Sequence, residues 1–357
     1  MVELVALCSS GLEGAVCIEL RRLGFKIQKV TAGHIHFNGQ LWDVPLLNSS
    51  LSSADRIMIH MKTFEATTFD ELYEGTKSAD WQEIVHRNGS ILVEKVKVRN
   101  SKLSATGAIA SVVKKAIYDS IKSTKETDGT EYPIYIYIKN DIVTLMLDTT
   151  GREGLSKRGY RIKTSKAPLR ETIAAALILM SDWDEKTLLV DPFCGSGTIP
   201  IEAARIAMRI PNLRKFSFER WQIFQNIQKQ VITHKEVQSS TLSMGFDKDC
   251  EVLKVAIENA RRARVSDKVI FRCKSFDKLS PFTPGQAHVV TNPPFGMRMK
   301  EGDSHFYRDL SKLFYLFEDC RICLITPKEN FEEIVKIRAT KKFKFQNSGI
   351  WTWCYIF

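Results

Sequence analysis

After residue 185 the sequence alternates between short apolar stretches and helical stretches, and this alternation limits the possible fold more than any other feature. The apolar stretches have the length and composition of strands, and they are "TLLVDPF", "TLSMGFD", "KVIFRCKS", "AHVVTNPP" and "RICLITP". Helical stretches separate several of them, and a helical crossover is the connection that parallel strands need. The pattern therefore predicts a parallel sheet with helices on both faces. The final stretch, "KKFKFQNSGIWTWCYIF", predicts a hairpin that turns at residues 347–349.

The first strand of this half leads into a turn that contains two glycines. In "LLVDPFCGSGTIPIEAA" the apolar run ends at Asp191, the chain turns through Gly195 and Gly197, and a helix begins near Thr198. A glycine pair alone is more typical of a tight strand–helix turn than of a binding site. However, open α/β sheets bind ligands beyond the carboxyl ends of their strands. The turn is neither GxGxxG nor a P-loop, and its acid favours a cationic ligand over a pyrophosphate.

Two further acids follow the next two predicted strands. Asp247 ends the second strand in "MGFDKD", where an acid commonly holds ribose hydroxyls in doubly wound folds. Asp277 comes just after the third strand in "CKSFDKL", where it would accept a hydrogen bond from an adenine amino group. Each acid alone is more typical of a helix cap or a turn. Acids at the ends of three successive strands instead favour one binding edge for a nucleoside-containing ligand.

The fourth predicted strand ends in the sequence "TNPPFG". Pro293 and Pro294 end the sheet, because proline has no N–H to donate and its φ is fixed. Asn292 supplies an amide that both donates and accepts, and Phe295 supplies a flat face. Such a corner predicts a site for a planar group that carries an NH2.

The front half of the chain predicts two smaller α+β units and a connector. Residues 1–55 have the pattern strand, helix, strand, strand, and residues 56–150 add further strands, two helices and a hairpin that turns at residues 139–141. Residues 151–185 form a basic connector and an entry helix, with Pro168 in its first turn. Residues 186–357 form the large α/β domain. A chain of 357 residues is long enough for such a multidomain organisation.

Composition excludes several classes of protein. No run of 18 apolar residues is present, and Glu3 lies where a signal peptide would be basic, so neither a membrane span nor secretion is predicted. The eight scattered cysteines favour a reducing cytoplasm over a disulfide framework. Cys320 and Cys323 have CxxC spacing, but no second pair completes a metal site, so they are interpreted as two strand residues. The seven dispersed histidines give no catalytic arrangement, and no metal is expected.

The formal net charge of +11 is concentrated in two stretches. Residues 95–125 carry +7 and residues 151–170 carry +6, which leaves the remainder of the chain slightly acidic. Such concentration is what a surface for a polyanion requires, although two solvated basic faces would give the same count. We expect RNA contacts from cations in these stretches, namely Arg99, Lys102, Lys114, Lys115, Lys157, Arg158 and Arg161.

Several of these motifs resemble one known family. "DPFCGSGTIPIEAA" and "TNPPFG" are similar to motifs I and IV of class I S-adenosylmethionine-dependent methyltransferases that act on amino nitrogens. "GLSKRGYR", "APLRETIAAALILM", "VRNSKLSATGAIASVVKKAI" and "GLEGAVCIELRRLGF" resemble segments of RNA guanine-N2 methyltransferases of bacteria and archaea. The resemblance covers essentially the whole chain. It implies an N-terminal ferredoxin-like domain, a THUMP RNA-binding domain and a C-terminal Rossmann-like class I methyltransferase domain.

The resemblance also implies roles for individual residues. Asp191, Cys194, Gly195 and Gly197 would line the methionine half of S-adenosylmethionine, Asp247 its ribose, and Phe276 with Asp277 its adenine. The corner from Asn292 to Phe295 would hold the target base, and Asn292 would also border the cofactor. The stretch "GMRMKEGD" departs from the "GER" that usually follows this corner.

The implied activity is methyl transfer to the exocyclic N2 of a guanosine in rRNA or tRNA, in the cytoplasm. Two alternatives keep the fold and change the function. The first is amino methylation of another substrate, adenine N6 or a protein glutamine, since the NPPF corner is shared with those enzymes. The second is a non-catalytic RNA-binding module, against which the intact Asp191, Gly195, Gly197 and Asn292 argue.

Overall fold

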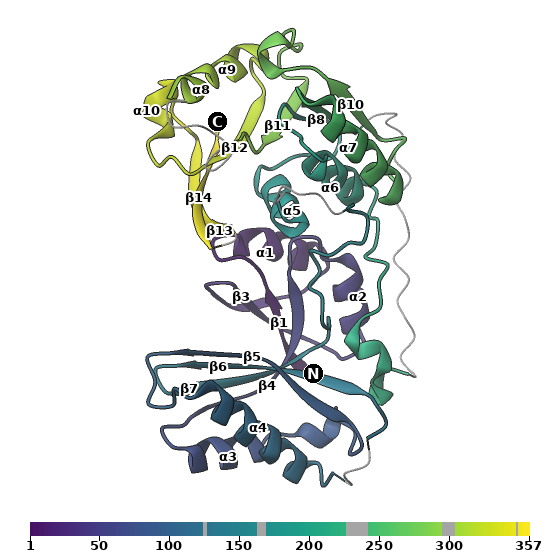
Figure 1. The fold of residues 1–357 in the computed structure, drawn as a ribbon, viewed down its shortest axis with the longest axis vertical. Coiled ribbons are helices and arrows are strands. Elements are labelled where there is room, and N and C mark those ends of the chain that lie inside the picture. Colours follow the sequence, from purple (N-terminus) through teal and green to yellow (C-terminus); the bar gives the residue numbers. More distant parts are fainter. Residues whose placement is uncertain (124–126, 163–168, 226–241, 295–303, 348) are drawn as a thin grey trace.

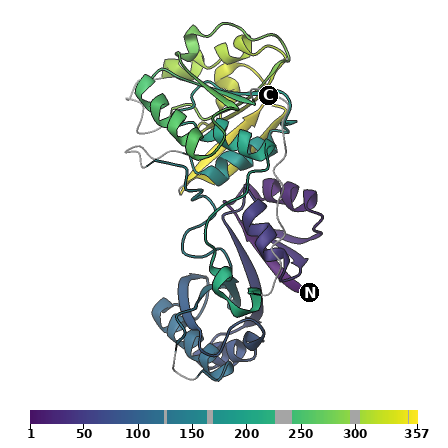
Figure 2. The ribbon, with the colours of Figure 1, turned by 90° about the vertical axis from the view of Figure 1, so that its right-hand side faces the viewer.

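The structure is a computed structural model that describes residues 1–123, 127–162, 169–225, 242–294, 304–347 and 349–357. The molecule is elongated, with the front half of the sequence at one end and the α/β domain at the other (Figures 1 and 2). Each half is built on a seven-stranded sheet.

The first sheet has the strand order β2-β3-β1-β4-β7-β6-β5. Its strands are β1 (Val2–Leu7), β2 (Ile27–Thr31), β3 (His34–Gly39), β4 (Arg56–Glu65), β5 (Ser90–Arg99), β6 (Glu131–Lys139) and β7 (Ile142–Asp148). The long strand β4 pairs with β1 through its first residues and with β7 along nearly its whole length. The sheet is therefore continuous across the expected boundary at residues 55 and 56.

Helices cover one face of this sheet. They are α1 (Glu13–Arg22), α2 (Asp43–Ser50), α3 (Phe69–Lys77) and α4 (Thr106–Ser120). Helix α4 buries Ile109, Val113 and Ile117, which follow the helical period predicted from the sequence, against alternate residues of β5 and β6. The predicted hairpin is also confirmed, because Asn140 and Asp141 both have positive φ, as a tight mirror-image turn requires.

The second sheet has the order β10-β9-β8-β11-β12-β14-β13. Its strands are β8 (Leu188–Asp191), β9 (Ser243–Asp247), β10 (Val269–Cys273), β11 (Ala287–Thr291), β12 (Arg321–Thr326), β13 (Lys341–Asn347) and β14 (Ile350–Ile356). The first five are parallel, and the terminal hairpin adds two antiparallel strands, as predicted. Strand order reverses between β8 and β11, which is where doubly wound sheets bind ligands.

Helices lie on both faces of the second sheet. They are α5 (Glu171–Met180), α6 (Thr198–Ala207), α7 (Cys250–Arg262), α8 (Ser304–Asp309), α9 (Lys312–Leu316) and α10 (Phe331–Val335). Helices α5 and α6 belong to one core, together with Ala15 of α1 and Leu12 just before it, whereas α8 to α10 belong to the core on the opposite face. The shared core with α1 ties the two halves together.

A segment after α6 returns to the front half, which the sequence did not predict. It contains short 3-10 helices at Ser217–Arg220 and Gln222–Phe224 and lies beside the first sheet (Figure 2). The Trp221 indole stacks on Tyr132 with ring centroids 5.0 Å apart, and its Nε1–H donates to the Glu131 carbonyl at 3.0 Å. This segment is a second link between the halves.

The cysteines differ in part from the expectation. Cys250 and Cys273 form a disulfide, with Cα atoms 5.2 Å apart, between the start of α7 and the end of β10. The residues are 23 apart in sequence and meet only because β9 and β10 are neighbours. Cys323 lies in β12 as predicted, and its Sγ is 3.4 Å from that of Cys354.

Among the described residues, no helix is both long and apolar enough to span a membrane. The same residues contain no cluster of three or more side chains suited to hold a metal ion.

Candidate active site

The glycine turn after β8 is held in place by its own backbone and by β9. The Cys194 N–H donates to the Phe246 carbonyl at 2.9 Å, and Gly197 N–H donates to the Cys194 carbonyl at 2.9 Å. Gly197 has φ +82°, and a Cβ there would lie 2.7 Å from Cζ of Phe271, so only glycine fits. Gly195 has φ +52°, and no described atom lies within 4 Å of the position of its missing Cβ. The turn thus exposes a backbone that a ligand can approach closely.

Asp191 is the buried acid at the centre of the site. Its Oδ1 accepts hydrogen bonds from Thr291 Oγ1 at 2.7 Å and from the Phe193 N–H at 3.0 Å. Burial, with a smaller contribution from the charge of Asp247, raises the pKa of Asp191 to about 7, while the two hydrogen bonds oppose the rise. The carboxyl group therefore titrates near neutrality, and a cationic ligand would favour its ionised form.

Asp247 lies at the end of β9, beside the glycine turn. Its Oδ2 accepts from the Gly195 N–H at 2.9 Å, and its Oδ1 accepts from the Asp249 N–H at 2.9 Å. The structure therefore brings Asp247 together with Asp191 and the glycines, as predicted for neighbouring parallel strands. The carboxylate also fixes the orientation of the glycine turn.

The side chain of Cys194 points into the protein, so only the backbone of Cys194 can face a ligand at the carboxyl ends of the strands. The thiol is buried against Gly245 of β9, where an added Cβ would lie 2.8 Å from the sulfur. Burial raises the pKa of the Cys194 thiol well above its ordinary value, so the thiol is neutral at physiological pH.

Asp277 and Phe276 lie in a short 3-10 helix after β10. Asp277 is exposed and accepts a hydrogen bond from the Ser275 hydroxyl, which lowers the pKa of Asp277. The Phe276 ring is buried, 4.8 Å from the ring of Phe193 and 6.2 Å from that of Phe306. Three phenyl rings from the glycine turn, the third strand end and α8 therefore gather beside the acids. Sequence reasoning missed Phe193 and Phe306, although Phe193 lies within the glycine motif.

The proline corner follows β11, the neighbour of β8, and the hydrogen bond from Thr291 to Asp191 links the two strand ends directly. Pro293 is buried and Pro294 is half-buried. The side-chain oxygen of Asn292 is buried and has no hydrogen-bond partner in the described parts of the chain. Phe295 lies outside the described residues, as do Met297 and Arg298.

A buried asparagine of α7 also supports the site, and sequence reasoning did not identify it. The Asn259 amide donates from Nδ2 to the Ser196 carbonyl in the glycine turn at 3.0 Å. Its Oδ1 accepts from the Ile162 N–H in the connector at 2.9 Å. A polar residue on the otherwise buried face of a helix, beside Ala256 and Ala260, was the available signal.

Comparison with known proteins places this arrangement in a family. Residues 158–353 match the "RMKL-like, methyltransferase domain", residues 3–58 the "RlmL ferredoxin-like domain" and residues 66–148 the THUMP domain. The chain belongs to the RMKL-like methyltransferase family. This confirms the predicted resemblance and the predicted order of a ferredoxin-like, a THUMP and a Rossmann-like domain.

Three relatives of this RMKL-like methyltransferase are similar over nearly the whole chain. "Putative RNA methyltransferase YpsC" of Bacillus subtilis is 34% identical, over 98% of this chain and 94% of that protein. "Ribosomal RNA large subunit methyltransferase K/L" of Colwellia psychrerythraea is 31% identical, and the match spans 98% of this chain but 52% of that protein. The crystal structure of "SMU.472, a putative methyltransferase complexed with SAH" has 31% identity and a TM-score of 0.86, and covers 100% of this chain and 97% of that chain. The prediction of S-adenosylmethionine as the cofactor is confirmed at the level of the family.

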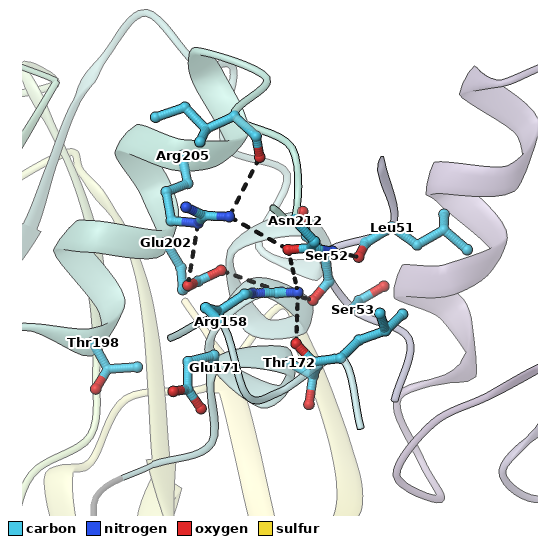
Figure 3. A network of polar contacts seen from close by, with 12 residues as sticks. Leu51, Ser52, Ser53, Arg158, Glu171, Thr172, Thr198, Glu202, Arg205 and Asn212 are labelled. Atoms are coloured by element: carbon cyan, nitrogen blue, oxygen red, sulfur yellow. Dashed lines mark hydrogen bonds and ion pairs between the residues drawn. The ribbon is translucent and has the colours of Figure 1, made fainter. Parts of the chain in front are cut away.

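Two of the predicted RNA-binding cations form ion pairs within the methyltransferase, and one of them, Arg158, is buried. The Arg158 side chain is 1% exposed and pairs with Glu202 at 3.4 Å. It also donates to the Leu155 carbonyl and to Asn212 Oδ1, both at 2.9 Å, within the network of Figure 3. Arg161 pairs with Glu171 at 3.1 Å. Both guanidinium groups hold the connector against α5 and α6, so the expectation that Arg158 contacts RNA is wrong for this structure.

The other predicted cations do not form a single patch. Arg99 lies at the end of β5, with its side chain on the sheet face opposite the helices, whereas Lys114 and Lys115 lie on α4, on the helical side. The Lys114 and Lys115 ammonium groups lie over the rings of Tyr118 and Tyr73, at 5.8 and 5.7 Å from the ring centroids. Lys102 and Lys157 are exposed in loops. The predicted cations are thus distributed over both faces of the front half.

Proposed function

We propose that this protein transfers a methyl group from S-adenosylmethionine to the exocyclic N2 of a guanosine in RNA. The observation that carries the proposal is the unpartnered side-chain oxygen of Asn292, one residue after the hydrogen bond between Thr291 and Asp191. Leaving a buried acceptor without a partner costs about 1–3 kcal/mol. An amino group of a substrate would supply the missing donor.

The chemistry requires that the amino group be oriented. The lone pair of an amine attached to a purine is delocalised into the ring, so the nitrogen is a weak nucleophile. Hydrogen bonds from the NH2 group to the Asn292 oxygen and to the Pro293 carbonyl would direct the lone pair at the methyl group. Positioning of this kind and electrostatic stabilisation can supply most of the catalysis. Pro294 would stiffen the corner, and Phe295, outside the described residues, would stack on the base.

Bound S-adenosylmethionine supplies a methyl group on a sulfonium, which is a good leaving group. In the transfer the amine nitrogen would bond to the methyl carbon as the bond from that carbon to sulfur breaks, which would leave a neutral thioether, and the amine proton would pass to water. The residues present suit this cofactor. The open backbone at Gly195, with Cys194 and Gly197 in the same turn, would adjoin the methionine half, and the Asp191 carboxylate would face its ammonium group.

The rest of the cofactor would lie along the neighbouring strand ends. Asp247 would accept hydrogen bonds from the ribose hydroxyls. These would replace part of its present hydrogen bonding to the glycine turn, where it accepts from the Gly195 N–H. Asp277 and the backbone at Phe276 would bind the adenine. A base held in the proline corner must leave its helix, so the target nucleotide would be flipped out.

RNA is the substrate that the remaining features favour. The front half contains a THUMP domain and the two basic stretches at residues 95–125 and 151–170, and two relatives carry RNA methyltransferase names. Guanine is proposed from the family resemblance, because the corner itself would accept the amino group of adenine as well. Both rRNA and tRNA are compatible with this proposal. Either substrate would be met in the cytoplasm, which is the proposed location of the protein.

The test is methylation in vitro by Asn292→Ala, with the product identified by nucleoside mass spectrometry. Loss of an interaction that matters most in the transition state should lower turnover about a hundredfold or more. The affinity for S-adenosylmethionine, measured by calorimetry, should change little. N2-methylguanosine is the expected product. N6-methyladenosine would overturn the choice of base, methylation of a protein glutamine would overturn the choice of RNA, and normal turnover by Asn292→Ala would overturn the mechanism.

A further inference from the structure

A cavity of about 400 Å³ lies where the front half meets the terminal hairpin, and we refer to it as the junction cavity. Its volume is within the range of about 300–1,000 Å³ that is usual for ligand sites. Its lining comes from β5 and β6, from the loops around β1 and β3, from the start of α5 and from the tip of the β13–β14 hairpin. In Figure 1 this hairpin reaches down from the α/β domain toward α1 and β3.

The floor of the junction cavity is an alternating set of lysines and tyrosines. Strands β5 and β6 are parallel, and their register places Lys95 opposite Tyr135 and Lys97 opposite Tyr137. Because side chains two residues apart share a face, all four lie on the same side of the sheet. Tyr135 packs in a small cluster with residues of β1, β4 and β7, apart from the core beneath α3 and α4. The four side chains therefore occupy the face without helices.

Two of the cations in the cavity are already neutralised. Arg170 pairs with Asp55 at 3.5 Å, and Arg56 pairs with the buried carboxylate of Asp148. Within the described ranges, no ion pair involves Lys95 or Lys97. Partial burial and the nearby charges of Lys97 and Arg56 lower the pKa of Lys95. An anion in the cavity would relieve this repulsion.

The walls of the junction cavity are flat and firmly held. The His34 ring meets the Tyr137 ring edge to face, with centroids 5.1 Å apart and planes at 87°. The hairpin tip is fixed because the Gln346 N–H donates to the Ser10 carbonyl at 2.9 Å. Gly11 adds to the fit, since a Cβ there would collide with the hairpin backbone at Lys344 and Phe345.

We propose that the junction cavity binds a single-stranded segment of the RNA substrate, with a base against Tyr137 and the adjoining phosphates at Lys95 and Lys97. Aromatic rings beside unpaired cations are the combination that binds single strands, because rings stack on bases while cations neutralise phosphates. The cavity is walled by three parts of the chain, which suits a single strand better than a duplex. The assignment rests on the proposed function only in taking RNA as the substrate.

The test is fluorescence anisotropy with the full chain and a labelled oligouridylate of about eight nucleotides, a length that single-strand sites commonly span. Tyr137→Leu should weaken binding about tenfold or more through lost stacking. Lys97→Ala should reduce the slope of log affinity against log salt by about 0.7, the value for one lost phosphate contact on a single strand. Lys254→Ala, which removes an exposed charge on α7, is the matched control and should leave affinity and slope unchanged.

Two further measurements test whether the effect of Tyr137→Leu is specific to single strands and whether the variant is folded. Tyr137→Leu should not weaken binding of a duplex RNA, and its affinity for S-adenosylmethionine should be normal, which shows that the variant is folded. Unchanged single-strand affinity in Tyr137→Leu together with an unchanged salt slope in Lys97→Ala would overturn the assignment. These results are independent of the base that is methylated. Adenine as the target would overturn the proposed function while leaving the cavity assignment intact.

Discussion

The hydrogen bond from Thr291 to Asp191 should set the pH at which this protein binds its cofactor. Burial raises the pKa of Asp191 to about 7, and in the proposed binding mode its ionised form would attract the ammonium group of the cofactor. Affinity should therefore rise as pH increases from about 6 to 8 and then level off. Thr291→Val removes one of the two hydrogen bonds that stabilise the carboxylate while keeping the size of the buried side chain.

The size of the effect follows from that hydrogen bond. A hydrogen bond to a charged group contributes about 1.5–3 kcal/mol, and each pKa unit corresponds to about 1.4 kcal/mol. Thr291→Val should thus raise the pKa of Asp191 from about 7 to between about 8 and 9. At pH 7 a smaller fraction of the carboxyl is ionised, so affinity should fall by about five- to fiftyfold.

The assay is calorimetric titration of S-adenosylhomocysteine, which keeps the ammonium group and does not react, over pH 6 to 9. The Asp191→Asn protein should bind weakly, with affinity that no longer rises with pH. Thr352→Val is the matched control, because the Thr352 hydroxyl is buried in β14 and has no described partner. Its pH profile should match that of the unchanged protein.

Stability gives a second measurement with the opposite sign. Because the pKa of Asp191 in the fold lies above its ordinary value of 3.8, ionisation destabilises the protein without cofactor. The free energy of unfolding should fall as pH rises from about 4 to 7, by on the order of 4 kcal/mol at most, and Asp191→Asn should remove this decrease. An affinity profile in Thr291→Val with the same midpoint as the unchanged protein would refute the reasoning.

Three further outcomes are expected. Glu202→Gln should lower the free energy of unfolding in denaturant by about 3–5 kcal/mol, because it leaves buried arginines without a carboxylate; a loss below 1 kcal/mol would contradict this. Gly197→Ala should lower thermal stability through both its positive φ and a Cβ collision with Phe271, whereas Gly195→Ala should lower it less, through the strain of its positive φ alone, and should also weaken cofactor binding; equal effects of both on stability would count against the open turn. Reducing the disulfide between β10 and α7 should cost up to about 3 kcal/mol in denaturant unfolding, and an unchanged midpoint would exclude a stabilising role.

Sequence reasoning found the parts of the site that can be recognised from the carboxyl end of a single predicted strand. Asp191 and Asp247 could be placed because the carboxyl ends of parallel strands share an edge, whatever the exact packing. The proline corner could be placed for the same reason. Asn259 was missed because its role depends on two backbone partners that are distant from it in sequence. These are the carbonyl of Ser196 in the glycine turn and the N–H of Ile162 in the connector.

Charged residues were the least predictable. Arg158 and Arg99 look alike in the sequence, since each lies in a basic stretch. Only the fold shows that Arg158 meets Glu202, 44 residues away, in a buried pair, whereas Arg99 lies on an open sheet face. The Cys250–Cys273 bond was unpredictable for a similar reason, because it depends on which strands become neighbours.

Strand β4 joins the ferredoxin-like part and the THUMP part of the front half into one sheet, although the two parts match separate family models. The ferredoxin-like match ends at residue 58 and the THUMP match begins at residue 66, so most of β4 belongs to neither. Yet β4 carries the backbone hydrogen bonds that join one half of the sheet to the other. Cutting a gene where the THUMP match begins would separate β4 from β7 and leave an unpaired strand edge on both products. The two modules are therefore expected to be inherited, exchanged and expressed as one unit.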